Sequence, residues 1–269
     1  MMAASRLKGA RRLLRDIGTP AVLFALLAAL YILPPDTSLA EVRQAGVLRA
    51  CVPEAYPPLV TGDAAKPGFD VEVLREVASR MGVRLDLNRI SAMGRDFNPR
   101  NWRVTRTQCQ LLAGGTVDSP RTRSFLDVTQ PYLHTGWAVF SPESELALAG
   151  ARLGFYPGLT GLDRIALSRY LKEQEARTRV EQGMEALASK VAAGELDGGV
   201  GEVLSVTALA DARGWSVRDL PLERYPVVFG LWPGDLTLKR TLESTLASLK
   251  ADGTLQGIAD SYGLSAALE

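Results

Sequence analysis

The stretch LLAGGTVDSPRTRSFLDVTQPY, from Leu111 to Tyr132, decides the fold of this chain. It opens as a short apolar run closed by glycines, the pattern of a buried strand that ends in a turn. Arg121 and Arg123 follow beside small hydroxyl residues, just before a second apolar run that ends in Pro-Tyr. A guanidinium suits a carboxylate because its planar fork donates two parallel charge-assisted hydrogen bonds. The stretch therefore raises the question whether one arginine binds an anion or both are solvated surface charges.

Composition places the chain among ordinary globular proteins of one large domain or two lobes. It has 269 residues, of which 46% are hydrophobic and 23% are charged, enough to bury a sizeable core. Lys and Arg number 31 against 30 Asp and Glu. This balance gives no reason to expect nucleic acid as a partner.

Residues 1–40 have the pattern of a signal peptide or an N-terminal membrane anchor. A basic stretch, RLKGARRLLR, precedes an apolar, uncharged run from Ala21 to Leu33. That run is shorter than the roughly 20 residues of a spanning helix. Ser38-Leu39-Ala40 offers small residues to a signal peptidase and favours cleavage after Ala40, whereas an uncleaved anchor is the alternative. Both interpretations predict that the rest of the chain is periplasmic or extracytoplasmic.

Two cysteines lie in short apolar runs of the exported part. Cys51 belongs to VLRACV, and Cys109 begins CQLLAGG. In an oxidising compartment such a pair favours a disulfide, which would contribute roughly 4 kcal/mol in the chain-entropy model. The alternative is two small buried hydrophobic side chains.

Strand and helix patterns alternate along both halves of the chain. Apolar residues recur at helical spacing from Val71 to Met81, where Asp70 is placed to cap the helix start. VRLDLNRI then alternates as a half-buried strand does. The second half repeats the alternation and ends in a long amphipathic helix, LTLKRTLESTLASLKADG. The order predicts open α/β sheets, with paired strands where the chain crosses between two lobes.

Four stretches together resemble the family 3 extracellular solute-binding proteins, the amino-acid-binding components of ABC importers. GVLRACVPEAYPPL with PGFDVEVLREVASRMGV is similar to the family's opening, and the stretch quoted first is similar to its second signature. KVAAGELDGGVGE and LESTLASLKADGTLQGIADSYG are similar to its second-lobe segment and its C-terminal helices. The resemblance runs from Gly46 to Gly263 in the family's order.

The resemblance implies a two-lobed periplasmic-binding-protein-like fold of type II. Each lobe would be an open, mostly parallel sheet flanked by helices, with two hinge crossovers between the lobes. Residues 41–134 plus 229–269 would form lobe 1, and residues 135–228 would form lobe 2. The implied function is to capture a small amino acid or related carboxylate between the lobes and to deliver it to the importer's permease. The protein would act as a monomer.

The family uses an arginine to bind the ligand's carboxylate, but the spacing here departs from its pattern. Counting back from Pro131-Tyr132, the family's arginine falls on Thr122, between the two candidates. We favour Arg123 over Arg121 because Pro120 places the irregularity before it. Other candidates from lobe 1 are Ser119 and the amides of Gly115 and Thr116, for which a simple turn at the strand end is the alternative. Tyr56 is a candidate to stack on the ligand, with ordinary core packing as the alternative.

In lobe 2, Glu202 stands where the family has an aspartate that holds the ligand's ammonium group. The alternative is a helix-start charge that faces the helix dipole. Gly158 and Thr160 match a family loop that binds the carboxylate, while Leu159 replaces a hydroxyl residue there. Trp137 is a candidate to stack on the ligand, with core packing as the alternative.

Enzymatic and metal-binding interpretations find little support in the sequence. The only histidine is His134, and no Gly-x-Ser-x-Gly motif or phosphate-binding loop accompanies it. We therefore expect no enzyme, no cofactor and no metal. One enzymatic alternative shares the fold, since the resemblance extends to periplasmic cyclohexadienyl dehydratases, in which Glu202 would act as a general acid. Another alternative is a ligand-sensing lobe for a membrane partner.

Overall fold

The structure is a computed structural model that describes residues 20, 22–24, 35–93, 102–156 and 162–268. It divides into two units, Met1–Thr37 and Ser38–Glu269. Within the described ranges, no helix combines the length and the apolar character needed to cross a membrane. The described helices of the second unit are α2 (Ser38–Ala45), α3 (Phe69–Arg80), α4 (Pro120–Arg123), α5 (Arg164–Glu173), α6 (Met184–Ala192), α7 (Val203–Asp211), α8 (Leu236–Ala251), α9 (Thr254–Ser261) and the 3-10 helix η2 (Ser265–Ala267).

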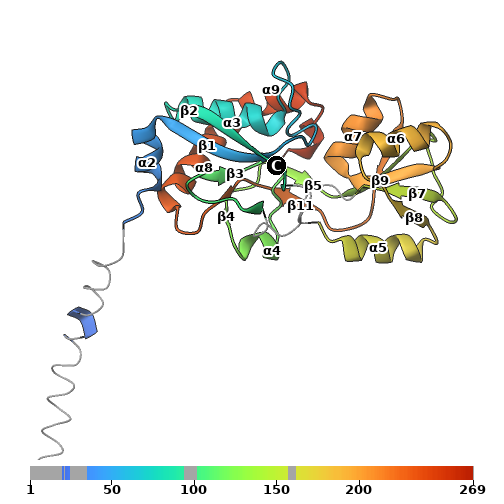
Figure 1. The fold of residues 1–269 in the computed structure, drawn as a ribbon, viewed down its shortest axis with the longest axis horizontal. Helices are drawn as coiled ribbons and strands as arrows, with labels where there is room; N and C mark the ends of the chain where they lie inside the picture. Colours follow the sequence, from blue (N-terminus) through green and yellow to red (C-terminus); the bar gives the residue numbers. More distant parts are fainter. Residues whose placement is uncertain (1–19, 21, 25–34, 94–101, 157–161, 269) are drawn as a thin grey trace, which may run out of the picture. The chain divides into compact units, whose positions relative to one another are not determined.

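Among the described residues, the strands of the second unit form two five-stranded sheets and one pair. Figure 1 shows α3 and α8 beside the sheet that contains β1 and β3, and α5, α6 and α7 beside the sheet that contains β7, β8 and β9. The first sheet has the order β2-β1-β3-β12-β4, and the second has the order β10-β6-β9-β7-β8. We call the parts built around them lobe 1 and lobe 2. The strands are β1 (Val47–Pro53), β2 (Arg84–Ile90), β3 (Leu111–Leu112), β4 (Asp127–Val128), β5 (Leu133–Thr135), β6 (Trp137–Ser141), β7 (Arg152–Phe155), β8 (Arg177–Val180), β9 (Gly198–Glu202), β10 (Ser216–Asp219), β11 (Tyr225–Val227) and β12 (Gly230–Leu231).

Each sheet is mostly parallel. In lobe 1, β1 pairs in parallel with β2 and β3, while β12 runs antiparallel to both β3 and β4. In lobe 2, β7 pairs in parallel with β8 and β9, while β6 runs antiparallel to β9 and β10. The reversed strands, β6 and β12, are those that the chain forms just after each crossing between the sheets. This arrangement agrees with the fold class predicted from the sequence.

The chain crosses between the two sheets twice, at β5 and β11, which pair antiparallel. His134, at the expected end of the first part of lobe 1, lies opposite Pro226 in this pair. Isolated bridges add Val117 opposite Val227 and Leu133 opposite Leu268. The paired strands therefore join the lobes without a flexible linker.

Lobe 1 buries the apolar faces of its helices against its sheet. Phe69 and Leu74 of α3 and Leu238 and Leu242 of α8 are fully buried in one core cluster. Lobe 2 has two clusters, one around Leu153 and one around Phe140, which lies in β6. The leucine register expected for the C-terminal helix is present, and α8 is followed by the short α9.

The predicted disulfide is confirmed. Cys51 of β1 is bonded to Cys109, 58 residues further along, with 5.6 Å between their Cα atoms. Met93, Trp102 and Leu112 pack around the bond, and the indole nitrogen of Trp232 donates to the Cys109 carbonyl over 2.7 Å. The bridge therefore fixes the start of β3 beside β1.

The sequence predicted that Asp70 caps α3, and this prediction is wrong. The helix begins after Gly68, and no side chain caps it. The Asp70 side chain is fully buried and turns toward the residues after β3 instead. At the N-terminal end, α2 begins at Ser38, two residues before the expected cleavage point, and the Ser38 hydroxyl lies 3.1 Å from that of Thr237 in α8.

Candidate ligand-binding site

A buried carboxylate, Glu202, joins residues of both lobes. It ends β9, and its side chain caps α7 by accepting from the amides of Leu204 and Ser205 over 3.1 and 3.0 Å. Tyr56, in the loop after β1, donates its hydroxyl to the same carboxylate over 3.0 Å. The hydroxyl of Thr135, at the end of β5, donates to the other oxygen. Glu202 therefore serves as a helix cap and as an acceptor between the lobes.

A second buried carboxylate, Asp70, fixes the turn after β3. It accepts from the amides of Gly114 and Gly115 over 2.6 and 3.1 Å, and from the Tyr132 hydroxyl over 2.9 Å. Gly114 has a φ of +90°, and a Cβ there would lie 2.4 Å from the Pro53 ring, so only glycine fits. Burial raises the pKa of the Asp70 carboxyl to about 6, against the lowering effect of these hydrogen bonds.

The predicted residues Tyr56, Gly115 and Glu202 lie around one small cavity. Leu59, Val117, Leu162 and Leu204 are among its other wall residues. Its volume is about 10 Å³, roughly that of one water-sized sphere. A ligand larger than water can occupy this place only if the surrounding side chains move apart.

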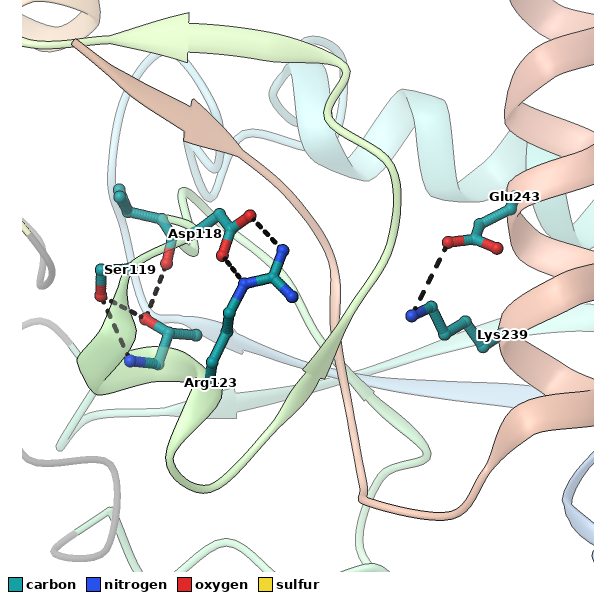
Figure 2. Close-up of polar contacts among 7 residues, drawn as sticks. Asp118, Ser119, Arg123, Lys239 and Glu243 are labelled. Carbon is teal, nitrogen blue, oxygen red and sulfur yellow. Dashed lines mark hydrogen bonds and ion pairs between the residues drawn. The ribbon is translucent and has the colours of Figure 1, made fainter.

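The two candidate arginines lie on α4, and both are exposed. Figure 2 shows that Arg123 turns to Asp118, to which its Nε and one terminal nitrogen donate over 2.5 and 2.6 Å. Thr122, at the position of the family's arginine, is buried and donates its hydroxyl to the Val117 carbonyl over 2.6 Å. A ligand that binds Arg123 must therefore replace Asp118.

The remaining predicted residues fall in several places. Ser119 caps α4 by accepting from the Thr122 amide over 3.2 Å, and Thr116, three residues before Ser119, is buried. Trp137 is buried in the core of lobe 2, where it packs on Phe155 with 5.7 Å between ring centres. Gly158 and Thr160 lie outside the described residues.

One cation was not predicted from the sequence. Arg164 opens α5 directly after its cap, Asp163, and is half-buried. Burial lowers the pKa of the Arg164 guanidinium to about 10, and Tyr56 acts in the opposite direction. The structure places Arg164 in the first turn of α5, after the cap formed by Asp163. Nothing in the sequence shows that this turn lies near Tyr56, because the two are far apart in the chain.

The fold and the buried residues shared between its lobes define a two-lobed binding protein of the periplasmic type. The family model for bacterial extracellular solute-binding proteins, family 3, matches residues 48–265. The chain therefore belongs to this family. No curated protein matches the chain.

Solved structures similar to the chain have the type II periplasmic-binding fold. An ancestral cationic amino acid solute-binding protein matches with a TM-score of 0.68 and 18% identity, over 84% of this chain and 99% of that one. A substrate-binding protein of an ABC uptake transporter from Streptococcus pneumoniae, with bound histidine, matches at 0.66 and 17%, over 84% and 96%. A substrate-binding protein of an amino acid ABC transporter from the same organism, bound to L-arginine, matches at 0.65 and 18%, over 84% and 98%. The ancestral protein is also described as a precursor of cyclohexadienyl dehydratase.

Proposed function

We propose that the chain is an extracytoplasmic solute-binding protein that captures a small amino acid or related carboxylate between its lobes and delivers it to an ABC importer. The hydrogen bond from Tyr56 of lobe 1 to Glu202 of lobe 2 carries this proposal, because it joins the lobes at two predicted ligand positions. The amino acids bound by the similar proteins from Streptococcus pneumoniae support the ligand class.

The N-terminal segment supports an exported protein. A basic stretch followed by an apolar run is typical of a signal peptide or an anchor, and the family is extracellular. The partner in the membrane would be the permease of the importer. The protein would bind its ligand as a monomer, with β5 and β11 acting as the hinge.

The ligand's carboxylate would be held on the lobe 1 side by Arg123, in exchange for Asp118, or by Arg121. The ligand's carboxylate would replace one bidentate, solvent-exposed pair by another of the same geometry, so the exchange would lose no hydrogen bond of Arg123. The Thr116 amide and the Ser119 hydroxyl would assist, and Gly158 and Thr160 would do so from lobe 2. The Gly115 amide would have to leave the Asp70 carboxylate, to which it donates over 3.1 Å, before it could bind the ligand. The ligand's ammonium group would displace Tyr56 or Thr135 from Glu202.

A thermal-shift screen of the purified chain against the amino acids and small carboxylates tests this function. A ligand at 100 times its dissociation constant stabilises the folded state by roughly 2.7 kcal/mol. We expect one amino acid or a related group to raise the melting temperature. We expect Arg123→Ala to abolish the shift and Arg121→Ala to retain it, and the reverse result moves the carboxylate site to Arg121. A panel without any shift contradicts the proposed function.

A further inference from the structure

Helix α2 lies beside the start of α8 in lobe 1, and the two helices cap each other (Figure 1). The Ser38 hydroxyl oxygen accepts from the Leu238 amide of α8 over 3.3 Å. In return, the Thr237 hydroxyl oxygen accepts from the Leu39 amide, in the first turn of α2, over 3.4 Å. The two hydroxyls lie 3.1 Å apart. Each helix therefore satisfies an amide at the start of the other, where no partner exists within the same helix.

The start of α8 depends on this contact for its cap. Its own N-cap residue, Asp235, makes no side-chain hydrogen bond to the helix and pairs with Arg106 instead. A serine hydroxyl that accepts from the third helical amide is a common cap, and here that serine comes from α2. Ser38 is buried, with 7% of its surface exposed, and Val42 is fully buried in the core of lobe 1. Helix α2 is therefore an integral part of lobe 1 from its first residue.

The cleavage point expected from the sequence falls inside α2. Cleavage after Ala40 would remove Ser38 and Leu39 and would leave Glu41–Ala45, little more than one helical turn. The mature chain would then lack the hydroxyl that caps α8. Small residues two positions apart, the pattern that a signal peptidase reads, occur nowhere else between Ala21 and Ala40. A mature chain that keeps its caps therefore has no alternative cleavage point of this kind in that range.

The stretch before α2 has the sequence of a segment that stays in a membrane. The apolar run is short, but the uncharged stretch around it extends from Ile17 to Pro35, close to the roughly 20 residues of a spanning helix. The basic stretch RLKGARRLLR precedes it and favours a cytoplasmic N-terminus, with the lobes outside. Most of this stretch lies outside the described residues, and its sequence alone supports the anchor.

We propose that residues 1–37 are retained in the mature protein and anchor the lobes at the outer face of the cytoplasmic membrane. The reciprocal caps between α2 and α8 carry this inference, because the folded lobe uses the residues that cleavage would remove. The tether keeps the binding protein next to its membrane partner and so raises the effective concentration of each for the other. The inference rests on the export in the proposed function and does not depend on the ligand.

Expression of the full chain in a bacterium with two membranes, followed by fractionation and intact-mass measurement, tests the inference. We expect the mass of the full sequence, 29.0 kDa, in the membrane fraction, released by detergent but not by alkaline carbonate. Protease added to spheroplasts should digest the lobes, because they face outward. The matched control is Ala40→Gln, at an exposed position of α2, which blocks a peptidase that reads Ala40. Parent and Ala40→Gln should differ in mass only by the substituted side chain.

Ser38→Ala tests the cap in the protein that the cell retains. The substitution leaves a small residue at the position that a signal peptidase reads, so a cleaved protein would lose it and would melt like the parent. In the retained chain we expect the melting temperature, measured in detergent, to fall by roughly 2–4 °C, the effect of one lost cap. The matched control is Ser244→Ala, an exposed serine within α8, which should not lower the melting temperature.

The remaining outcomes separate this inference from the proposed function. A soluble periplasmic protein that begins at Glu41 overturns the inference and leaves the proposed function intact. An unchanged melting temperature for Ser38→Ala overturns the cap on which the inference depends. A full-length chain whose lobes are protected from protease in spheroplasts overturns both the inference and the proposed export. Failure of every amino acid and small carboxylate to bind contradicts the proposed function and leaves the anchor standing.

Discussion

The Glu202 carboxylate forms hydrogen bonds with residues of both lobes. It accepts from two backbone amides and from the hydroxyls of Tyr56 and Thr135. A buried acceptor with this many donors is costly to remove, since every donor is left without a partner. The helix-start role considered from the sequence is present in the structure. A role toward a ligand's ammonium group remains a prediction.

Replacement of Glu202 by alanine should therefore cost more than the loss of an ordinary helix cap. We expect a loss of about 3 kcal/mol in the free energy of unfolding, measured by urea denaturation. The matched control is Asp163→Ala, which removes the cap of α5 at an exposed site and should cost about 1 kcal/mol. Equal losses for the two variants would show that the contacts across the lobes add nothing.

Asp70 should make the stability of the chain depend on pH. Its folded pKa is raised from 3.8 to about 6 by burial, so its contribution to stability is complete below pH 3.8 and is lost as the pH rises through about 6. Relative to Asp70→Asn, the parent should therefore gain on the order of 1 kcal/mol between pH 7 and pH 5. Unfolding curves of both proteins at the two pH values measure this difference. A difference that does not change, or that favours the variant at low pH, contradicts the raised pKa.

These two carboxylates also show what the sequence could not reveal. The sequence predicted that Asp70 lies at the start of a helix, and the family resemblance placed Glu202 in the second-lobe segment. Neither placed the partners of Asp70, since Gly114 and Tyr132 lie 44 and 62 residues further along. The partner of Arg123 was equally hidden, although Asp118 is close in the chain, because an exposed arginine has many conformations. Contacts between side chains distant in sequence require the fold.

At the scale of elements, periodicity predicted the helices α3 and α8, the strand β2, and the alternation of strands and helices in both halves of the chain. It did not reveal β5, because Leu-His-Thr is three residues long and is no apolar run. Nor could it show that Arg164 in α5 lies near Tyr56. The family resemblance supplied the order of the lobes, which no local pattern contains.

The disulfide between β1 and the residue before β3 should be a major stabilising element of lobe 1. It closes a loop of 58 residues, for which the chain-entropy model gives roughly 4 kcal/mol. The double variant Cys51→Ala with Cys109→Ala should lose about 2–4 kcal/mol in the free energy of unfolding. Reduction of the parent by dithiothreitol should produce a similar loss and should not affect the double variant. A parent that is indifferent to reduction would contradict the stabilising role.

At the scale of the whole molecule, the lobes share buried polar groups and a small cavity. A solute site between the lobes remains a prediction for this chain. The spacing around Arg121 and Arg123 departs from the family's pattern, and Thr122 between them is buried, so a carboxylate site at either arginine remains a prediction.

The most direct test of solute binding is a calorimetric titration of the purified chain with the amino acids, followed by recovery of the ligand and its identification by mass spectrometry. The account predicts saturable binding of one amino acid per chain and recovery of that amino acid chemically unchanged. A ligand recovered as a different compound would instead indicate an enzyme like the cyclohexadienyl dehydratases. The absence of heat with every amino acid would contradict the account.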